Sequence, residues 1–259
     1  MIWINGATGA LGNYLKRISG ELVIGTGREL DITDKKDIKR FLKKFKPRVI
    51  IHLAGLKKQE CEYNKRLCVE INRIAPVELF KIAQDYGCQK FIFPSSCAVY
   101  NQTELKPTKE NENINPQSLY GASKHGAEEG LIEACHTSLV ILRIFNIYGV
   151  GFNSSLINQI LLDNAEVINP DNYYRDYIYA EDVANIIRES VTMDMKGSYV
   201  VNVGSGISRS TREVLKTLKE YGFEIKTKEI EGEPSYSWAD TTLMNQLFEY
   251  PISENLIIK

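Results

Sequence analysis

Short runs of hydrophobic residues, rich in β-branched side chains, alternate along this chain with segments whose hydrophobic positions recur at helical spacing. Such runs are typical of strands buried on both faces, and their alternation with helices is typical of a parallel sheet covered on both sides. The pattern therefore predicts an α/β fold with a doubly wound parallel sheet. The predicted strands are 2–4, 22–24, 49–53, 90–94, 138–144 and 198–203.

The same periodicity predicts the crossover helices and a division of the chain. The expected helices are one after Gly12, one over 34–46 and one over about 71–86. The alternation is regular over 1–148, which we predict to be one domain, with the strand near 198–203 returning to it. We expect 149–259 to form mainly a small lobe over the carboxyl ends of the strands, where ligands bind in open α/β sheets.

Composition and charge exclude several classes of protein. The 259 residues include 32 basic and 33 acidic side chains, a formal charge of −1, so we expect no nucleic-acid or anionic-membrane partner. No stretch of about 18 apolar residues and no export signal is visible, which argues against a membrane span. The five cysteines are odd in number and form no C-x-x-C pair, which argues against a disulfide framework or a zinc site and favours a cytoplasmic location. The three histidines are scattered, so we predict no metal site.

A glycine-rich turn follows the first predicted strand. Gly6, Gly9 and Gly12 are spaced three residues apart between that strand and a helix. Glycine permits a tight turn and close backbone approach, and a helix N-terminus then faces a pyrophosphate. The sequence therefore predicts a Rossmann-type dinucleotide site. Its expected cofactor-binding residues in the turn are Gly6, Thr8, Gly9, Ala10, Leu11 and Gly12.

The end of the second predicted strand bears on which dinucleotide binds. NAD sites usually carry an acid there for the ribose hydroxyls, whereas an arginine accepts the extra phosphate of NADP. This segment has Arg28 and no acid before Glu29, with Asp31 close behind. The sequence favours NADP bound by Arg28, and NAD bound with Asp31 is the alternative.

Tyr120 and Lys124 are four residues apart downstream of the glycine turn. On a helix this spacing places both side chains on one face, where the ammonium is expected to lower the pKa of the phenol. A tyrosine with such a pKa can transfer a proton to or from a sugar hydroxyl near neutral pH. The pair indicates hydride chemistry on a nicotinamide cofactor.

Together these motifs resemble the extended short-chain dehydrogenase/reductase family, particularly its nucleotide-sugar epimerases, dehydratases and reductases. The likeness covers nearly the whole chain in a shared order and spacing. Its motifs are the glycine turn, 51–55 (IHLAG), 95–100 (SSCAVY), the Tyr120/Lys124 pair, 142–149 (LRIFNIYG), 175–183 (RDYIYAEDV) and 201–205 (VNVGS).

The resemblance implies roles for individual residues. Ser96 would bond the substrate oxygen, Tyr120 would be the general acid/base, and Lys124 would hold the nicotinamide ribose. Asn146 and Arg175 match positions that hold the nucleotide diphosphate in relatives, and an arginine can bind phosphate with a forked contact. Further cofactor contacts are expected from Leu53, Ala54 and Gly55.

Departures from the family pattern narrow the reaction. Cys97 and Ala98 stand where 4,6-dehydratases have an Asp-Glu pair, so dehydration is not expected. The fucose-synthase type of reductase has its cysteine one place later and a histidine where 151–155 has none, which argues against combined epimerisation and reduction. We interpret Cys97 as a packing residue. Segment 231–240 also lacks the second diphosphate-binding arginine of many epimerases.

The sequence therefore favours an NADP-dependent enzyme that reduces a 4-keto nucleotide sugar. The nearest alternative is a nucleotide-sugar 4-epimerase that retains NAD, since Ser96, Tyr120 and Lys124 would serve both reactions. A further alternative is a non-catalytic protein that senses the cofactor or binds a partner. By analogy with relatives we also expect a homodimer.

Overall fold

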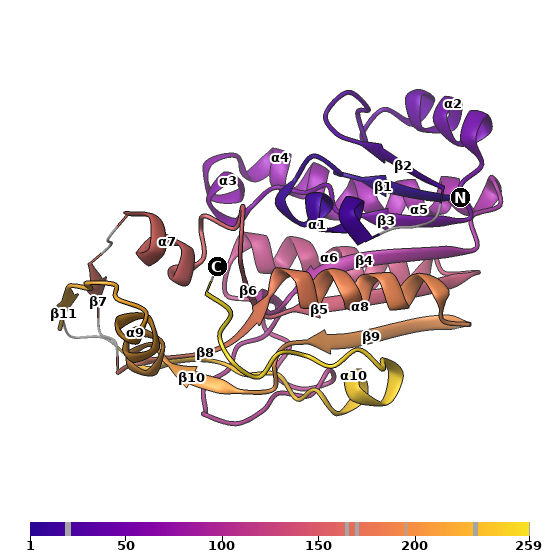
Figure 1. Ribbon diagram of the computed structural model, residues 1–259. Coiled ribbons are helices and arrows are strands. Elements are labelled where there is room, and N and C mark those ends of the chain that lie inside the picture. Colours follow the sequence, from indigo (N-terminus) through magenta and orange to yellow (C-terminus); the bar gives the residue numbers. More distant parts are fainter. Residues whose placement is uncertain (19–21, 164–165, 169–170, 195, 230–232, 259) are drawn as a thin grey trace.

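The computed structural model describes residues 1–18, 22–163, 166–168, 171–194, 196–229 and 233–258 (Figure 1). Its largest element is a six-stranded, wholly parallel sheet in the order β2-β1-β3-β4-β5-β9. Every predicted hydrophobic run forms one of these strands, which confirms the predicted fold class. The strands are β1 (Ile2–Asn5), β2 (Val23–Thr26), β3 (Val49–His52), β4 (Lys90–Ser96), β5 (Ser138–Ile144) and β9 (Gly197–Val203).

The strand order contains a topological switch point. β1 pairs with β2 on one side and with β3 on the other, so the chain changes winding direction after β2. Loops that leave the carboxyl ends of β1 and β3 therefore run to opposite faces of the sheet and leave a crevice between them. The glycine turn follows β1 at this crevice.

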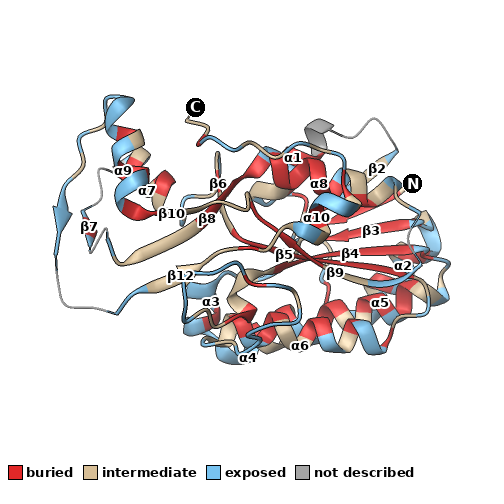
Figure 2. Cartoon of the chain, turned by 90° about the horizontal axis from the view of Figure 1, so that it is seen from below, coloured by how far each residue is buried: buried red, intermediate tan, exposed pale blue. Residues whose placement is uncertain are grey.

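Helices cover both faces of the sheet. Residues of α1, α8 and α10 share one buried apolar cluster with one side of the strands, and α2, α5 and α6 share a second cluster with the other (Figure 2). Each cluster takes alternate side chains of the same strands, as the pleat requires. These helices are α1 (Ala10–Ile18), α2 (Lys35–Phe45), α5 (Ala75–Asp85), α6 (Leu119–Glu133), α8 (Ala180–Thr192) and α10 (Thr242–Leu247).

Two of the predicted helix bounds need correction. The first helix begins at Ala10 rather than after Gly12, so Gly12 lies inside its first turn. The helix predicted over 71–86 is continuous with two earlier helical segments, α4 (Lys65–Val69) and a π-helical turn (Glu70–Ile74), which precede α5. A separate helix, α3 (Lys58–Tyr63), ends before Asn64. By contrast, α2 matches its prediction, because the Asp34 side chain accepts hydrogen bonds from Lys36 N and Asp37 N and caps the helix.

A smaller lobe projects beyond the carboxyl edge of the sheet, at the left of Figure 1. Its central strand β8 pairs with β6, β10 and β12, while β7 pairs with β11. The lobe has an apolar cluster of its own, to which α7 and α9 contribute. Its elements are β6 (Asn146–Tyr148), α7 (Leu156–Asp163), β7 (Val167–Ile168), β8 (Tyr173–Tyr179), β10 (Ser208–Ser210), α9 (Thr211–Glu220), β11 (Thr227–Lys228) and β12 (Ser235–Ser237).

The expectation that argued against disulfides is wrong for one cysteine pair. Cys61 and Cys68 form a disulfide between α3 and α4, with their Cα atoms 4.7 Å apart. The chain turns at Asn64, whose side chain caps α4, and this turn brings two cysteines seven residues apart face to face. Cys88, Cys97 and Cys135 have free thiols.

Over the described ranges, no helix is long and apolar enough to cross a membrane. In that same part of the chain, no three His, Cys, Asp or Glu residues are grouped so as to hold a metal ion.

Candidate active site

A cavity of about 850 Å³ lies between the carboxyl ends of the sheet strands and the small lobe. It brings together residues that the sequence scatters from the first turn to the second half of the chain. Thr8, Arg28, Asp31 and Ala54 are predicted site residues that do not line it. The predicted residues that do line it are Gly6, Gly9, Ala10, Leu11, Gly12, Leu53, Gly55, Ser96, Tyr120, Lys124, Asn146 and Arg175.

The glycine turn is shaped as the sequence predicts for a dinucleotide. Gly6 has φ +81°, and a Cβ there would lie 2.5 Å from the backbone N of Ala54. A Cβ on Gly12 would lie 2.5 Å from the carbonyl oxygen of Ala7. Both glycines therefore allow backbone contacts that any side chain would prevent, and the N-terminus of α1 opens into the cavity. These residues fit the pyrophosphate of a nicotinamide dinucleotide, because the N-terminus of α1 carries a positive partial charge that favours an anion.

The end of β2 carries a carboxylate that the sequence analysis passed over. Glu29 accepts a hydrogen bond from Gly27 N at 2.7 Å. A Cβ on Gly27 would lie 2.8 Å from Thr8 Oγ1 and 2.9 Å from Glu29 Oε2, so the two side chains lie close together. Arg28 is exposed and has no hydrogen-bond or ion-pair partner among the residues that the structure describes. Asp31 instead accepts hydrogen bonds from the backbone N and hydroxyl of Thr33, which also lower its pKa. Asp31 thus stabilises the turn before α2, and Glu29 lies beside Gly27, close to Thr8 of the glycine turn.

Ser96 and Tyr120 meet on the cavity wall. Ser96 ends β4, and its hydroxyl accepts a hydrogen bond from Ala98 N at 3.2 Å. Tyr120 lies in the first turn of α6, which Ser118 caps. Burial raises the pKa of the phenol, and hydrogen bonding with Ser96 opposes that rise. Both hydroxyl groups therefore face the same cavity, and their contact with one substrate oxygen stays a prediction.

Lys124 does not act on Tyr120 as predicted. Its Nζ donates to the carbonyl oxygen of Pro94 at 2.7 Å and lies 4.1 Å from the centre of the Phe93 ring. Burial lowers the pKa of Lys124 to about 8, with Glu128 opposing the change. The expectation of a lowered Tyr120 pKa is thus wrong for this structure, since desolvation of the phenol dominates.

Asn146 and Arg175 reach the cavity from the small lobe. Asn146 Nδ2 donates to the carbonyl oxygen of Asp176 at 3.0 Å and to Ser237 Oγ at 3.1 Å. The guanidinium of Arg175 donates to Ser235 O at 2.7 Å and to Ser235 Oγ at 2.9 Å. Both side chains therefore hold β8 against β12, and their predicted contact with a diphosphate stays a prediction.

Asp176 is a buried residue of the lobe that the sequence analysis did not single out. Its carboxylate accepts hydrogen bonds from Ser205 N at 2.6 Å, Ser205 Oγ at 2.7 Å, Gly206 N at 3.0 Å and Ala239 N at 3.2 Å. Burial raises its pKa to about 6. It joins β8 to the loop after β9 and to the segment that carries Ala239. Its place next to Arg175 in the 175–183 motif was the available signal.

Cys97 supports the packing interpretation. Its side chain is half-buried on the cavity wall, and Ser237 Oγ donates to its Sγ at 3.6 Å. Burial raises the pKa of the thiol, which therefore stays protonated.

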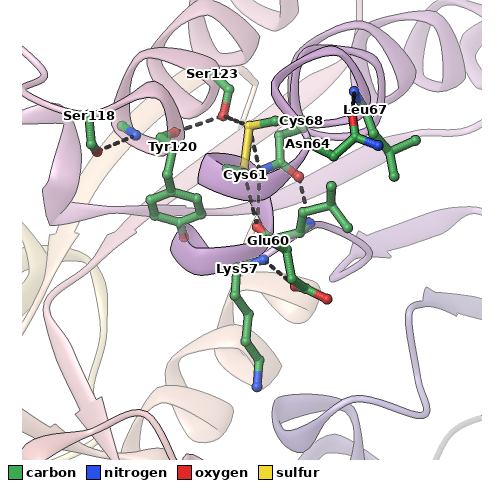
Figure 3. The surroundings of a disulfide bond; sticks show 12 residues. Lys57, Glu60, Cys61, Asn64, Leu67, Cys68, Ser118, Tyr120 and Ser123 are labelled. Carbon is green, nitrogen blue, oxygen red and sulfur yellow. Dashed lines mark hydrogen bonds between the residues drawn. A yellow bond between two sulfur atoms is a disulfide. The ribbon is translucent and has the colours of Figure 1, made fainter.

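The disulfide lies next to the start of α6: Figure 3 shows Cys68 close to Ser123, which lies beside Tyr120. Asn72 exchanges two hydrogen bonds with the backbone of Leu56, a cavity residue, and its Nδ2 lies 3.3 Å from Cys61 Sγ. Cys68 Sγ lies 3.5 Å from Ser123 Oγ, which donates to Tyr120 O at 2.7 Å. The crosslink thus braces the loop after β3 against the helix that carries Tyr120.

The sequence of this chain is similar to a protein-family model and to known proteins. The model of the NAD dependent epimerase/dehydratase family matches residues 2–204. A protein of Methanocaldococcus jannaschii, described as a putative UDP-glucose 4-epimerase, is 30% identical over 237 residues, which are 82% of this chain and 73% of that protein.

Solved structures share the fold. MoeE5 in complex with UDP-glucuronic acid and NAD superposes with a TM-score of 0.86 at 22% identity, over 97% of this chain and 93% of MoeE5. The dTDP-4-dehydrorhamnose reductase of Bacillus anthracis in complex with NADP gives a TM-score of 0.84 at 22% identity, over 96% and 93% of the two chains.

Proposed function

Because the chain belongs to the NAD dependent epimerase/dehydratase family, we propose that it reduces a 4-keto sugar carried on a nucleoside diphosphate. Family membership confirms the resemblance predicted from the motifs and makes the chain an NAD(P)-dependent enzyme that modifies nucleotide sugars. The observation that supports oxidoreduction of a sugar at this site is that Ser96 and Tyr120 face one cavity with the glycine turn. A substrate oxygen and a nicotinamide ring can therefore meet there.

The cofactor is bound by the turn residues and positioned by Lys124. Gly6, Gly9 and the N-terminus of α1 would hold the pyrophosphate, and Lys124 would hold the nicotinamide ribose. When bound, the reduced nicotinamide supplies a hydride to the carbonyl carbon. Tyr120 gives its proton to the carbonyl oxygen, so that the C=O bond becomes an alcohol and the phenolate is reprotonated from solvent. Ser96 donates a hydrogen bond to the same oxygen and stabilises its developing charge.

The raised pKa of Tyr120 supports reduction over oxidation as the first step. Burial keeps the phenol protonated at neutral pH, and a ketone reduction begins by using that proton. Arg28, exposed at the end of β2, is available for the extra phosphate of NADP. We accordingly propose NADP as the cofactor.

Nucleotide-sugar 4-epimerisation with retained NAD is the second candidate, and two observations favour it. The Glu29 carboxylate lies beside the glycine turn, where a carboxylate accepts hydrogen bonds from the ribose hydroxyls of NAD. The relative from Methanocaldococcus jannaschii is described as a putative UDP-glucose 4-epimerase.

A non-catalytic role in cofactor sensing or partner binding has less support. A protein that only senses the cofactor would need the glycine turn, but it would not need a serine and a tyrosine facing the same cavity as the turn. The proposed homodimer and cytoplasmic location stay predictions. Light scattering of the purified chain tests the dimer.

The deciding experiment follows NADPH and NADH fluorescence while the purified protein meets 4-keto sugars linked to GDP, dTDP, UDP and CDP. Stoichiometric NADPH consumption with one sugar supports the reductase and identifies its substrate class. Absence of consumption, together with tightly retained NAD and interconversion of the 4-hydroxy sugars, would replace the reductase with the epimerase. If neither reaction is observed, the non-catalytic alternative is supported instead.

A further inference from the structure

A buried ion pair lies beneath the helix that carries Tyr120 and Lys124. Glu128 of α6 is 1% exposed and Arg143 of β5 is 4% exposed. Arg143 Nη2 donates to Glu128 Oε2 at 2.7 Å, and Arg143 Nε lies 3.1 Å and 3.2 Å from the two carboxylate oxygens. Ser95 Oγ also donates to the carboxylate. The Glu128 carboxylate is thus fixed from two neighbouring strands.

Arg143 is itself held from further segments of the fold. Its Nη1 donates to Tyr100 Oη at 2.8 Å and to the carbonyl oxygen of Glu110 at 2.6 Å. Tyr100 in turn donates to Asn202 Oδ1 on β9 at 2.6 Å. A network with this many fixed partners leaves Glu128 little freedom to move.

Lys124 lies one helical turn before Glu128, on the same inward side of α6. Both side chains are buried, and residues four apart on a helix are neighbours. Lys124 also contacts the Pro94 carbonyl and the Phe93 ring of β4, and its charge acts on His52 of β3. His52 is buried and neutral, because burial and the nearby Lys124 lower its pKa to about 3. Among the described residues, Glu128 is therefore the negative charge that acts on Lys124.

We propose that Glu128 is a positioning residue for Lys124: its carboxylate, fixed by Arg143 and Ser95, keeps the Lys124 ammonium charged where the fold buries it. A buried ammonium loses solvation and is stable only where an anion or a polar group replaces it. The Pro94 carbonyl supplies one polar contact, and the fixed carboxylate supplies the charge. The consequence for turnover rests on the proposed function, because it requires Lys124 to act in its charged form.

The direct test measures the titration of Lys124 by NMR in the full chain labelled with [ε-¹³C]lysine, without cofactor. The signal is assigned by its loss in Lys124→Met, and its midpoint is expected near the pKa of about 8. Glu128→Gln keeps the shape of the side chain but removes its charge, so the midpoint should fall by about one pH unit. Glu129→Gln is the matched control, since Glu129 is the next residue on α6 and its side chain is 65% exposed. A folded Glu128→Gln protein whose midpoint moves by less than about 0.3 units overturns the proposal.

A second variant covers the risk that Glu128→Gln leaves Arg143 unpaired and unfolds the chain. Glu128→Met combined with Arg143→Met replaces the pair with apolar side chains of similar length, a change that buried ion pairs often tolerate. The midpoint should again fall, by a smaller amount because the arginine charge is removed as well. If neither variant folds, the pair is a structural requirement and the proposal is wrong.

Kinetics separate this inference from the proposed function. Loss of the carboxylate destabilises the charged ammonium, so the alkaline limb of the kcat profile should move to lower pH in Glu128→Gln and stay in place in Glu129→Gln. A pair with only a structural role would lower the yield or the Tm without moving that limb. The NMR midpoint needs no substrate, so a shifted midpoint in a protein without turnover refutes only the proposed function. An active enzyme with an unmoved midpoint refutes only the role of Glu128.

Discussion

Gly121→Ala is expected to disable the site by a small displacement of α6. Gly121 follows Tyr120, and a Cβ on it would lie 2.1 Å from the carbonyl oxygen of Ala98, in the turn that follows Ser96. Pro116 closes the other side, with its Cβ at 3.1 Å. Because the closest atom belongs to the backbone, no side-chain rotation relieves the contact. The helix and the turn must therefore separate.

The required separation is about 1 Å, because a carbon and an oxygen that are not bonded do not approach much closer than about 3 Å. A displacement of this size between an acid/base and its substrate can cost about 10²-fold in kcat. Overpacking of this kind costs about 1–3 kcal/mol, and the higher helix propensity of alanine returns about 1 kcal/mol. We expect a net loss of up to about 2 kcal/mol and, for a chain of this size, a fall in Tm of up to about 8 °C.

Gly126→Ala is the matched control in the same helix. A Cβ there would lie 2.7 Å from Arg73 Nε, near the end of a flexible side chain that can turn away. This variant should keep full turnover and an equal or higher Tm. Thermal and urea unfolding, followed by circular dichroism, measure stability. The kcat is measured with the substrate that the fluorescence panel identifies. Equal Tm and kcat values for the two variants would refute the close-approach argument.

The other expectations concern the acid, the cofactor and the crosslink. Tyr120→Phe should lower kcat by about 10²-fold or more without weakening the binding of NADPH. Near-normal turnover in the folded variant would exclude Tyr120 as the acid. Arg28→Ala should weaken NADPH far more than NADH in fluorescence titrations, and Glu29→Gln should do the reverse; equal effects on both cofactors would end both assignments. The combined variant Cys61→Ser and Cys68→Ser should lose about 2 kcal/mol and lower the Tm by about 4–8 °C. Thiol titration of the unfolded chain should count three thiols before reduction and five after it, and five before reduction would disprove the disulfide.

Local patterns were sufficient for the fold and for the cofactor turn. The six hydrophobic runs became the six strands of the sheet, because a strand buried on both faces needs apolar side chains in both directions. The glycine turn was equally readable, since a positive φ at Gly6 and a Cβ-free contact at Gly12 each require glycine itself. Asp34 could be placed as a cap for the same reason, because capping involves only neighbouring backbone groups.

Spacing along the chain was less informative where burial decides the chemistry. Tyr120 and Lys124 lie on one helix, as their spacing predicts. The Lys124 ammonium, however, donates a hydrogen bond to the Pro94 carbonyl and lies over the Phe93 ring. The spacing of two residues along a helix does not indicate how far the Tyr120 phenol is buried away from solvent. Glu29 was likewise discounted by its position in sequence, although the turn of the chain places its carboxylate beside Gly27.

The sequence by itself determined the sheet, the glycine turn and the family, because strands, turns and caps depend on residues close together in the chain. Tertiary structure alone decided which distant groups meet: Glu128 with Arg143, and Asp176 with Ser205 and Ala239. Each of these pairings depends on how helices and strands pack after the chain has crossed the sheet. The charge state of Lys124 follows from that packing, since it is set by the water that the fold excludes and by the one carboxylate fixed beneath it.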